Sequence, residues 1–575
     1  MPVRNAAIAA IFDEIADLLE IESANPFRIR AYRNAARTIQ GLGADLRVLL
    51  DQGEDLTQIP GIGKDLAAKI KEIIDTGSCA ALRKLHERVP PALSDLLRIP
   101  GLGPKRVGAL YKALGIRTRK QLQSALQQRR IRNLPGFGEK TEARILEVLQ
   151  ADLQKKRHFQ LVTAAGYAES LVKYLKDTKG VQDVIVAGSV RRCKETVGDL
   201  DIVATARRDS PVMDRFTAYD EVKEVLSQGT TRTTIVLKCG LQVDLRVVPK
   251  TSLGAALQYF TGSKAHNIAI RRLGQRRGLK INEYGVFKND RRVGGATEKS
   301  VYASVGLAYM PPELRENRGE IELARRGPLP TLVQLPDCKG DLHCHTRASN
   351  GGNSIREMAL AARAHNLQYL AITDHSKGSS IARSLDERRL LAQWQEIDRL
   401  NDELEGIYLL KGIEVHILED GRLDLADTIL GQLDLVLGSI YSDFGLSRAK
   451  QTRRIQRAMN HPHFSILADP SGRLLEERGP INVDMARVIH EARNRGCFLE
   501  LNAQPKRLDL VDSYCQMAKQ EGVLISIDSG AYRTSDFDNL RFGVGQARRG
   551  WLTPADVLNT SSLGKVCKLL KRTMQ

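Results

Sequence analysis

Hydrophobic and polar residues follow two different periods along the chain, and the change of period divides it into regions. Up to residue 150 the apolar positions recur at helical spacing, as Leu18, Leu19 and Ile21 do on one face of the first expected helix. Beyond that point come short apolar runs of strand type, at 184–187, 200–204, 233–238 and 243–248. The pattern predicts a helical N-terminal region followed by a region that mixes helices and strands.

A motif with one proline and two glycines occurs three times in the helical region. Its copies are Ile59-Pro60-Gly61-Ile62-Gly63-Lys64, Ile99-Pro100-Gly101-Leu102-Gly103-Pro104-Lys105 and Leu134-Pro135-Gly136-Phe137-Gly138-Glu139-Lys140. Glycine lets the backbone approach a ligand closely, and the helix that follows begins with free N–H groups. Each copy is therefore a candidate seat for a phosphate group, contacted without reading bases.

These copies resemble helix-hairpin-helix motifs. A dinucleotide-binding loop would need a preceding strand and a third glycine, and the copies have neither. The candidate DNA-binding residues are Gly61, Gly63, Lys64, Gly101, Gly103, Lys105, Gly136 and Gly138. The alternative is three helical turns without a ligand, and Glu139 makes the third copy the weaker candidate.

Two acids stand at the start of the second strand-type run. Asp199 and Asp201 are two residues apart, so their side chains share one face of a strand. Their charges repel, and a divalent metal would remove that repulsion. A third acid, Asp244, lies in the run 241–248. Three carboxylates on two neighbouring strands can hold two Mg²⁺ ions roughly 3.5–4 Å apart, the arrangement that serves phosphoryl transfer.

A small turn, Gly188-Ser189, precedes these acids and follows the run 184–187. Its N–H groups can face a triphosphate, and Ser189 and Arg192 can add donors. An isolated pair of aspartates is more often a turn or surface feature, and the turn together with Asp244 favours a metal site. The stretch from Gly188 to Asp201 resembles the nucleotidyltransferase signature of family X DNA polymerases, the polymerase beta relatives.

The resemblance implies a palm in which Asp199 and Asp201 bind both metals. Asp244 would bind the catalytic metal and help to deprotonate the primer 3′-hydroxyl. The implied nucleotide-binding residues are Gly188, Ser189, Arg192, Gly198, Tyr259, Phe260, Gly262, Asn267 and Arg271.

The last five of these residues belong to a segment that resembles the family's thumb. Tyr259 and Phe260 would pack under the sugar, although such an aromatic pair is more often part of a core. Gly262 would allow a close approach of the backbone, Asn267 would meet the base edge, and Arg271 the template minor groove.

One lysine of the first helical domain has a further implied role. In family members with deoxyribose-phosphate lyase activity, a lysine at the position of Lys69 forms a Schiff base. A simple phosphate contact is the alternative for Lys69.

The region after residue 340 has a different chemistry, because it holds most of the 11 histidines. His343 and His345 share one face of a strand-type segment, and such a pair with a nearby acid makes a good divalent-metal cluster. With His375 and Glu414, the region resembles the PHP (polymerase and histidinol phosphatase) domain. That family's domain is a barrel of parallel strands and helices that holds three metals. At the C-terminus of bacterial family X polymerases it can act as a manganese-dependent 3′–5′ exonuclease.

The sequence departs from the PHP ligand pattern at several positions, while His343, His345, His375 and Glu414 match it. The departing positions carry Asn350, Tyr441, Asp469, Gly530 and Tyr532. Neither glycine nor tyrosine is an ordinary ligand for these metals. We therefore predict an absent or weak exonuclease and at most one residual metal, near His343, His345 and Glu414. The alternative is a site rebuilt by His416, Asp469 or Asp528.

Composition narrows the class of protein. A chain of 575 residues is long enough for several domains, and its net charge of +19 favours a polyanionic partner. Its 8 cysteines form no C-x-x-C pair, so we expect neither a zinc finger nor a disulfide framework. We find no signal peptide and no run of about 18 apolar residues, and expect a cytoplasmic, nucleoid-associated bacterial protein without membrane contact.

The expected fold is multidomain: a helical DNA-binding region with helix-hairpin-helix motifs, an α+β nucleotidyltransferase palm and thumb, and a PHP (β/α) barrel. The expected boundaries are 1–85 and 86–150 for two helical parts, 151–250 for the palm, 251–312 for the thumb, 313–339 for a proline-rich linker and 340–575 for the PHP domain.

The expected function is gap filling in DNA (base excision) repair. The expected partners are gapped or primed duplex DNA and dNTPs, for a monomer that uses two Mg²⁺ or Mn²⁺ ions and, as an option, a monovalent cation at the helix-hairpin-helix motifs. The alternatives are a DNA-structure-binding protein without chemistry and a PHP-type nuclease or phosphatase tethered to DNA by its N-terminal half.

Overall fold

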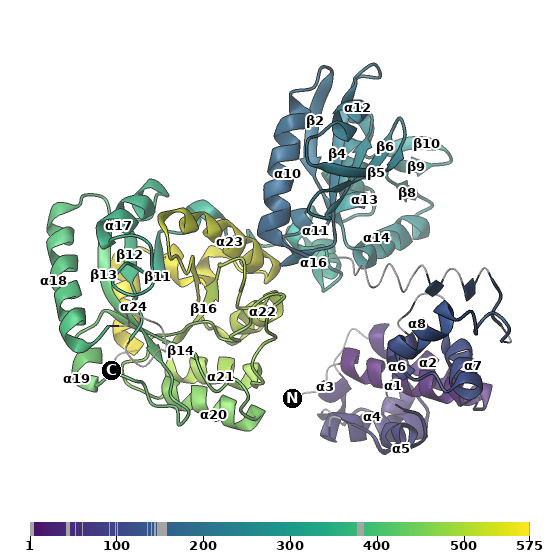
Figure 1. Cartoon of the computed structure of the whole chain (residues 1–575), viewed down its shortest axis with the longest axis horizontal. Coiled ribbons are helices and arrows are strands. Elements are labelled where there is room, and N and C mark those ends of the chain that lie inside the picture. The colour runs from purple at the N-terminus through teal and green to yellow at the C-terminus, as the bar shows by residue number, and fades with distance from the viewer. Residues whose placement is uncertain are drawn as a thin grey trace. The chain divides into compact units, whose positions relative to one another are not determined.

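The computed structural model describes most of the chain, which divides into two compact units, Met1–Lys156 and Arg157–Gln575 (Figure 1). The described residues are 5–22, 24–41, 46–51, 53–59, 61–76, 78–90, 93–97, 99, 102–134, 136–139, 141–142, 145–146, 158–376 and 385–573. No helix among them is both long and apolar enough to span a membrane.

The described part of the first unit contains helices and turns and no strand, as the hydrophobic spacing predicts. Its helices are α1 Asn5–Ile21, α2 Pro26–Gly41, α3 Leu46–Asp51, α4 Lys64–Thr76, α5 Ala80–Arg88, α6 Leu93–Leu97, α7 Pro104–Leu114 and α8 Arg119–Gln127, with a short 3-10 turn, η1, at Leu56–Gln58. The first helix, α1, packs against α2, α4, α5, α6 and α7. Its buried face includes Ile8, Phe12, Ile15 and Leu19, so α1 supplies the centre of this unit's core.

The second unit begins with a five-stranded sheet in the order β2-β4-β7-β6-β5. The strands are β2 Val181–Val186, β4 Asp199–Ala206, β5 Val222–Gln228, β6 Arg232–Leu237 and β7 Gln242–Val247. Only β4 and β7 are parallel neighbours, and the other pairs are antiparallel. Helices α10 Leu161–Lys176 and α12 Val212–Thr217 join the apolar core of this sheet, which is the α+β palm expected from the strand-type runs.

The thumb region follows with helices and a small antiparallel sheet, β10-β9-β8. Its elements are α13 Leu253–Thr261, α14 Lys264–Arg276, β8 Lys280–Asn282, β9 Gly285–Lys288, β10 Arg291–Gly294, α15 Glu298–Ser304 and α16 Glu320–Arg326.

The segment 313–339, predicted as an extended linker, is instead folded. It contains α16 and two 3-10 turns, η3 Pro312–Leu314 and η4 Leu335–Asp337. The carboxylate of Glu320 is buried and contacts His266 at 2.7 Å, and Arg315 is fully buried beside Glu298. Pro312 and Pro336 therefore lie in 3-10 turns of a packed segment. The contacts that hold the segment leave no local signature in the sequence, because their partners lie further back in the chain.

The C-terminal region is a seven-stranded parallel sheet whose strands follow chain order. They are β11 Gly340–Cys344, β12 Tyr369–Ile372, β13 Tyr408–His416, β14 Leu435–Ser439, β15 Ile466–Leu467, β16 Phe498–Asn502 and β17 Ile525–Asp528. The helices around it are α17 Ile355–Ala364, α18 Glu387–Glu403, α19 Asp427–Leu430, α20 Arg448–Met459, α21 Met485–Arg495, α22 Asp512–Glu521, α23 Leu540–Arg549 and α24 Leu563–Thr573.

The first and last strands of this sheet approach each other. The amide of Leu342 donates to Asp528 Oδ1 at 2.8 Å, and the amide of His345 donates to the Ala531 carbonyl at 2.8 Å. The sheet is thus a nearly closed barrel, as predicted, and parallel strands bring their carboxyl ends together at one rim.

Candidate functional site

The palm brings the three predicted acids onto two adjacent strands. Asp199 and Asp201 lie on β4, and Asp244 lies on β7, where it is the direct register partner of Asp201. Because the two strands are parallel and in register, Asp201 and Asp244 point to the same face, and Asp199 shares that face through the two-residue period.

The charge of this group is only partly balanced within the chain, by the ion pair of 3.1 Å between Arg232 and Asp244. Burial, followed by the nearby charges of Asp199 and Asp244, raises the pKa of Asp201 to about 7. Burial would also raise the pKa of Asp244, but hydrogen bonds from Thr234 Oγ1 at 2.6 Å, Gln242 Nε2 at 3.0 Å and Arg232 Nη2 at 3.1 Å hold it below its ordinary value. Repelling carboxylates on one face are a donor set suited to hard divalent cations.

The turn beside the acids is built on close contact with them. Gly188 begins the short helix α11 Gly188–Arg191 with φ of +62°, and a Cβ at this position would lie 2.4 Å from Asp201 Oδ2. Only glycine fits there without displacing the carboxylate. The next residue, Ser189, has a buried Oγ with no hydrogen-bond partner among the described residues. An unused hydroxyl beside the acids is consistent with a ligand contact at this turn.

Arg192 follows this turn and is held from two sides. Its Nη1 donates to the Thr261 carbonyl at 2.7 Å, and its Nε donates to Glu316 Oε1 at 3.0 Å. Gly198 lies in the bend between β3 Thr196–Val197 and β4, directly before Asp199. Sequence reasoning did not find Glu316, because its contact with Arg192 spans 124 residues.

The predicted aromatic pair lies at the end of α13. The rings of Tyr259 and Phe260 are 5.0 Å apart and edge-on. The guanidinium of Arg271 lies over Tyr259 at 5.8 Å, and that of Arg246 lies over Phe260 at 4.2 Å. Two cations flank the pair, so it forms a polar-edged platform and is not sealed inside a core.

Asn267 is nearly buried, and its side chain stays within the protein. Its Oδ1 accepts from Gln258 Nε2 at 2.9 Å, and its Nδ2 donates to the Gly262 carbonyl at 3.4 Å. A Cβ on Gly262 would lie 2.7 Å from Asn267 Oδ1. These two residues therefore shape the turn between α13 and α14, whatever else they contact.

The described residues of the three glycine motifs share one pattern of backbone hydrogen bonds. In each, an amide donates to a carbonyl three residues before it, as Ile62 to Ile59, Leu102 to Ile99 and Phe137 to Leu134 at 2.9–3.0 Å. The second glycine of each motif, Gly63, Gly103 or Gly138, accepts from an amide four residues later and so opens the next helix. Gly61 and Gly136 have φ of +84° and +83°, as a type II turn requires. Gly101 lies outside the described residues.

Lys64 and Lys105 occupy the first turns of the helices α4 and α7 that follow the motifs. Lys69 lies one turn further along α4, is mostly shielded from solvent and forms an ion pair with Asp65. The lysines thus lie at helix starts, where N–H groups and positive charge coincide.

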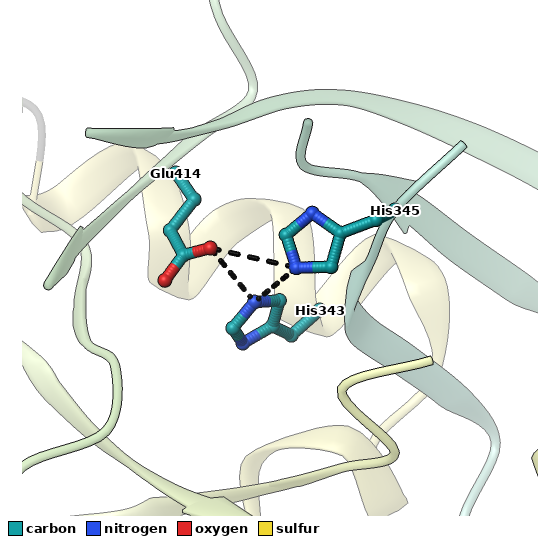
Figure 2. A group of neighbouring side chains, drawn as sticks. All are labelled: His343, His345 and Glu414. Carbon is teal, nitrogen blue, oxygen red and sulfur yellow. Dashed lines mark hydrogen bonds and ion pairs between the residues drawn. The ribbon is translucent and has the colours of Figure 1, made fainter. Parts of the chain in front are cut away.

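The barrel gathers His343, His345 and Glu414 so that one donor atom of each lies within 4.8 Å of the others (Figure 2). Glu414 Oε2 is 3.2 Å from His343 Nε2 and 3.1 Å from His375 Nδ1. Burial would lower the pKa of His343, but Glu500 and Glu414 hold it well above its ordinary value, whereas burial and the neighbouring His375 hold the pKa of His345 well below it.

Two of the positions that depart from the PHP pattern carry tyrosines that contact this group. Tyr441 Oη lies 3.0 Å from His375 Nδ1, and the Tyr532 ring stacks on His345 at 4.4 Å. Asp469 forms an ion pair of 2.9 Å with Arg507, a residue that sequence reasoning did not single out.

The other residues considered for this site contact neighbours outside the group of His343, His345 and Glu414. Asn350 is exposed and accepts from Ser349 Oγ at 3.2 Å, and a Cβ on Gly530 would lie 2.8 Å from Asn502 Oδ1. His416 Nε2 contacts Ser442 Oγ at 3.1 Å, and Asp528 Oδ1 accepts from the amide of Leu342. Among the described residues, His343, His345 and Glu414 are the one group of donor atoms gathered closely enough to hold a metal ion, and the residues at the departing positions do not complete the ligand set of a three-metal cluster.

Four family models match the chain in sequence order. They are a helix-hairpin-helix domain at residues 3–79, a SAM-like helix-hairpin-helix tandem at 93–151, a DNA polymerase beta thumb at 256–316 and a PHP domain at 341–529.

Curated proteins resemble the chain over very different lengths. The DNA polymerase/3′-5′ exonuclease PolX of Bacillus subtilis is 37% identical over 569 residues, which cover 98% of this chain and 99% of that protein. A probable phosphatase of a Thermoanaerobacter species is 28% identical over 242 residues, or 40% of this chain, and one of Acetivibrio thermocellus is 25% identical over 248 residues. The first similarity spans the whole chain, while the others cover less than half of it.

Proposed function

The chain belongs to the bacterial family X DNA polymerases that carry a C-terminal PHP domain, and we propose that it adds dNTPs to a primer on gapped or primed duplex DNA during repair. The observation that carries this proposal is the acid group Asp199, Asp201 and Asp244, on adjacent parallel strands beside the Gly188-Ser189 turn. All three acids are intact, which argues against a protein that only binds DNA.

The acids would bind the metal ions, and the turn would bind the triphosphate. Two divalent ions, Mg²⁺ or Mn²⁺, would be held by Asp199, Asp201 and Asp244 and would supply charge neutralisation at the 3′-hydroxyl and the leaving pyrophosphate. The hydrogen bonds to Asp244 keep its carboxylate ionised and fixed in direction, as a group facing a primer hydroxyl requires.

The nucleotide would lie between the turn and the thumb segment. The amides of Gly188 and Ser189, the free Ser189 hydroxyl and the Arg192 guanidinium can hold the triphosphate. Because Gly198 has no side chain, the backbone at this position could lie close to the phosphates. The platform of Tyr259 and Phe260 would support the sugar beside Gly262, Asn267 and Arg271.

The helix-hairpin-helix motifs would hold the DNA backbone of a monomeric enzyme. Their common turn geometry supports phosphate contacts by main-chain amides next to Lys64 and Lys105, and a monovalent cation at the turn carbonyls is part of the proposal. Their contacts carry no base sequence information, which suits an enzyme that fills gaps of any sequence.

Lys69 remains the candidate for a deoxyribose-phosphate lyase. Its position on α4, mostly shielded from solvent, supports a reactive amine, while its ion pair with Asp65 favours a structural role. Borohydride trapping on a 5′-deoxyribose-phosphate end tests this, and a yield unchanged by Lys69→Ala would exclude Lys69 as the Schiff-base residue.

We propose that the barrel has lost most or all of its 3′–5′ exonuclease activity. The tyrosines against His345 and His375 and the Arg507 ion pair with Asp469 support this, because they fill or neutralise ligand positions.

The decisive experiment is primer extension on a one-nucleotide gap with the wild type, Asp244→Ala and Asp183→Ala. Asp183 is a matched control, because it lies on β2 of the same sheet, and among the described residues its carboxylate accepts a hydrogen bond from Thr205 Oγ1 at 2.8 Å. We expect Asp244→Ala to lower the rate by about 10²–10³-fold, and Asp183→Ala to behave as the wild type. A wild type that binds the gapped duplex but adds no nucleotide in Mg²⁺ or Mn²⁺ would overturn the proposal.

A further inference from the structure

An arginine of the barrel, Arg549, contacts the main chain of Arg192 in the palm. Arg549 ends α23, and its Nη1 donates to the Arg192 carbonyl at 2.8 Å and to Glu316 Oε1 at 2.9 Å. Glu316 Oε1 also accepts from Arg192 Nε at 3.0 Å. Arg549 therefore contacts Arg192 twice, directly at its carbonyl and indirectly through the shared carboxylate.

This three-residue contact is largely shielded from water. The side chains of Arg192, Glu316 and Arg549 are 11%, 14% and 6% exposed. In such surroundings a carboxylate between two guanidinium groups carries strong hydrogen bonds, and the loss of one partner is felt by the other. With Arg549 present, the negative charge of Glu316 is shared. Without it, that charge would fall on Arg192 alone and compete with a triphosphate for the same guanidinium.

Arg549 is itself fixed in direction. Its Nη2 donates to Asp512 Oδ2 at 2.8 Å, and the same carboxylate accepts from Arg318 Nη2 at 2.7 Å. Asp512 belongs to α22 of the barrel, so the guanidinium of Arg549 is held by the barrel on one side and by the palm and thumb on the other. A side chain held on both sides can fix the position of Arg192 relative to the barrel.

The helix that carries Arg549 also presses on the residue after Arg192. Cys193 has φ of +53°, which is uncommon for a residue with a side chain. A Cβ on Gly545 would lie 2.9 Å from Cys193 Sγ, so only glycine at this position lets α23 approach the turn so closely. Gly545 and Arg549 are four residues apart and share one face of the helix. Phe542, on the same face, belongs to the apolar core of the palm.

We propose that the PHP barrel acts as a positioning element of the polymerase site, with Arg549 as the positioning residue that orients Arg192 toward the triphosphate of the incoming nucleotide. This inference rests on the proposed function. It gives the barrel a part in nucleotide binding that does not depend on its own degraded metal group.

Single-nucleotide incorporation on a gapped duplex, measured over a range of dNTP concentrations, tests the proposal with the full chain. We expect Arg549→Ala to raise the KM for dNTP about tenfold while kcat changes little, because contacts made equally in the ground and transition states affect KM alone. Affinity for the gapped duplex should stay unchanged. Arg549→Lys, which keeps a charge and donors, should restore part of the loss.

Arg541→Ala is the matched control. Arg541 lies on the same helix and pairs with Glu169 of the palm at 2.5 Å. Within the part of the chain that the structure describes, it forms no hydrogen bond or ion pair with Glu316 or Arg192. It should leave the KM for dNTP unchanged. In an Arg192→Ala background, Arg549→Ala should add nothing further, because coupled residues are not additive.

The outcomes separate the two proposals. A KM unchanged in Arg549→Ala, a rise of equal size in Arg541→Ala, or full additivity with Arg192→Ala would overturn the positioning role while leaving the polymerase intact. If Arg549→Ala fails to fold, Arg549→Gln replaces it in the test. Gln keeps a hydrogen-bond donor but removes the positive charge beside Glu316, so the KM for dNTP should still rise, and an unchanged KM would overturn the positioning role. A wild type without any activity would overturn the proposed function and this inference with it.

Discussion

The palm and the barrel each carry a polar group on parallel strands, but they differ in how its charge is balanced. In the palm, three acids face one another, and the pKa of Asp201 rises to about 7 through burial and repulsion. In the barrel, His343 lies between Glu414 and Glu500 at 3.2 and 2.6 Å, and Arg507 balances Asp469. In the palm, Arg232 balances only Asp244, and the pKa of Asp201 remains raised, whereas most of the charges in the barrel group have a partner of opposite sign.

This difference also explains the spacing of the two groups. Opposite charges draw His343 and Glu414 together, and with His345 their donor atoms lie within 4.8 Å of one another. No such compact group is formed by the three acids of the palm among the described residues. A ligand set gathered without a metal is therefore no proof of a working metal site. The unbalanced set is the better candidate for catalysis, and three substitutions can test that view.

The largest effect is expected in the palm, from Asp201→Asn. It should lower nucleotide incorporation by about 10³-fold, because a ligand for the ions is lost. In EDTA it should also raise the free energy of unfolding, by about 1 kcal/mol, because the repulsion with Asp199 and Asp244 is relieved. Urea denaturation and primer extension measure the two effects. A variant that unfolds more easily than the wild type in EDTA would show that repulsion does not govern this group.

A smaller effect is expected in the barrel, from Arg507→Ala. Asp469, which is buried, would lose its cation, and the free energy of unfolding should fall by about 3 kcal/mol. Lys506→Ala is the control, because the ion pair of 3.5 Å between Lys506 and Glu477 is exposed to solvent and contributes little to stability. Equal stability of Arg507→Ala and Lys506→Ala, compared by urea denaturation, would mean that Arg507 has not taken over the charge of a metal.

The smallest effect is expected from His343→Ala on nuclease activity. Because the barrel group is balanced and crowded by Tyr441 and Tyr532, we expect no measurable change in Mn²⁺-dependent degradation of a single-stranded 3′ end. Asp199→Ala is the parallel control for the palm. Robust degradation that is lost in His343→Ala but kept in Asp199→Ala would show that the barrel is an active exonuclease.

The sequence predicts features that depend on local spacing. The two-residue period places Asp199 and Asp201 on one face, and the glycine pattern gives the turns at Gly61 and Gly136. The tyrosines at 441 and 532 can be recognised as poor ligands without a structure.

Contacts between distant segments could not be predicted in the same way. Arg549 and Glu316 are 233 residues apart, and nothing near either residue marks the other. The prolines of 313–339 suggested an extended linker. The segment is packed because Glu320 is buried against His266, which lies 54 residues earlier in the chain. Asp469 could be read as a metal ligand because its partner Arg507 is also remote in sequence.

The carboxylate of Glu316 has a consequence for how such a protein can change over evolutionary time. Glu316 binds the guanidinium groups of Arg192 in the palm and Arg549 in the barrel. A substitution in either region at this contact would therefore disturb the other region. A lineage that discarded the barrel would inherit an orphaned negative charge next to its substrate, and would have to find a new cation for it before the shortened enzyme could compete.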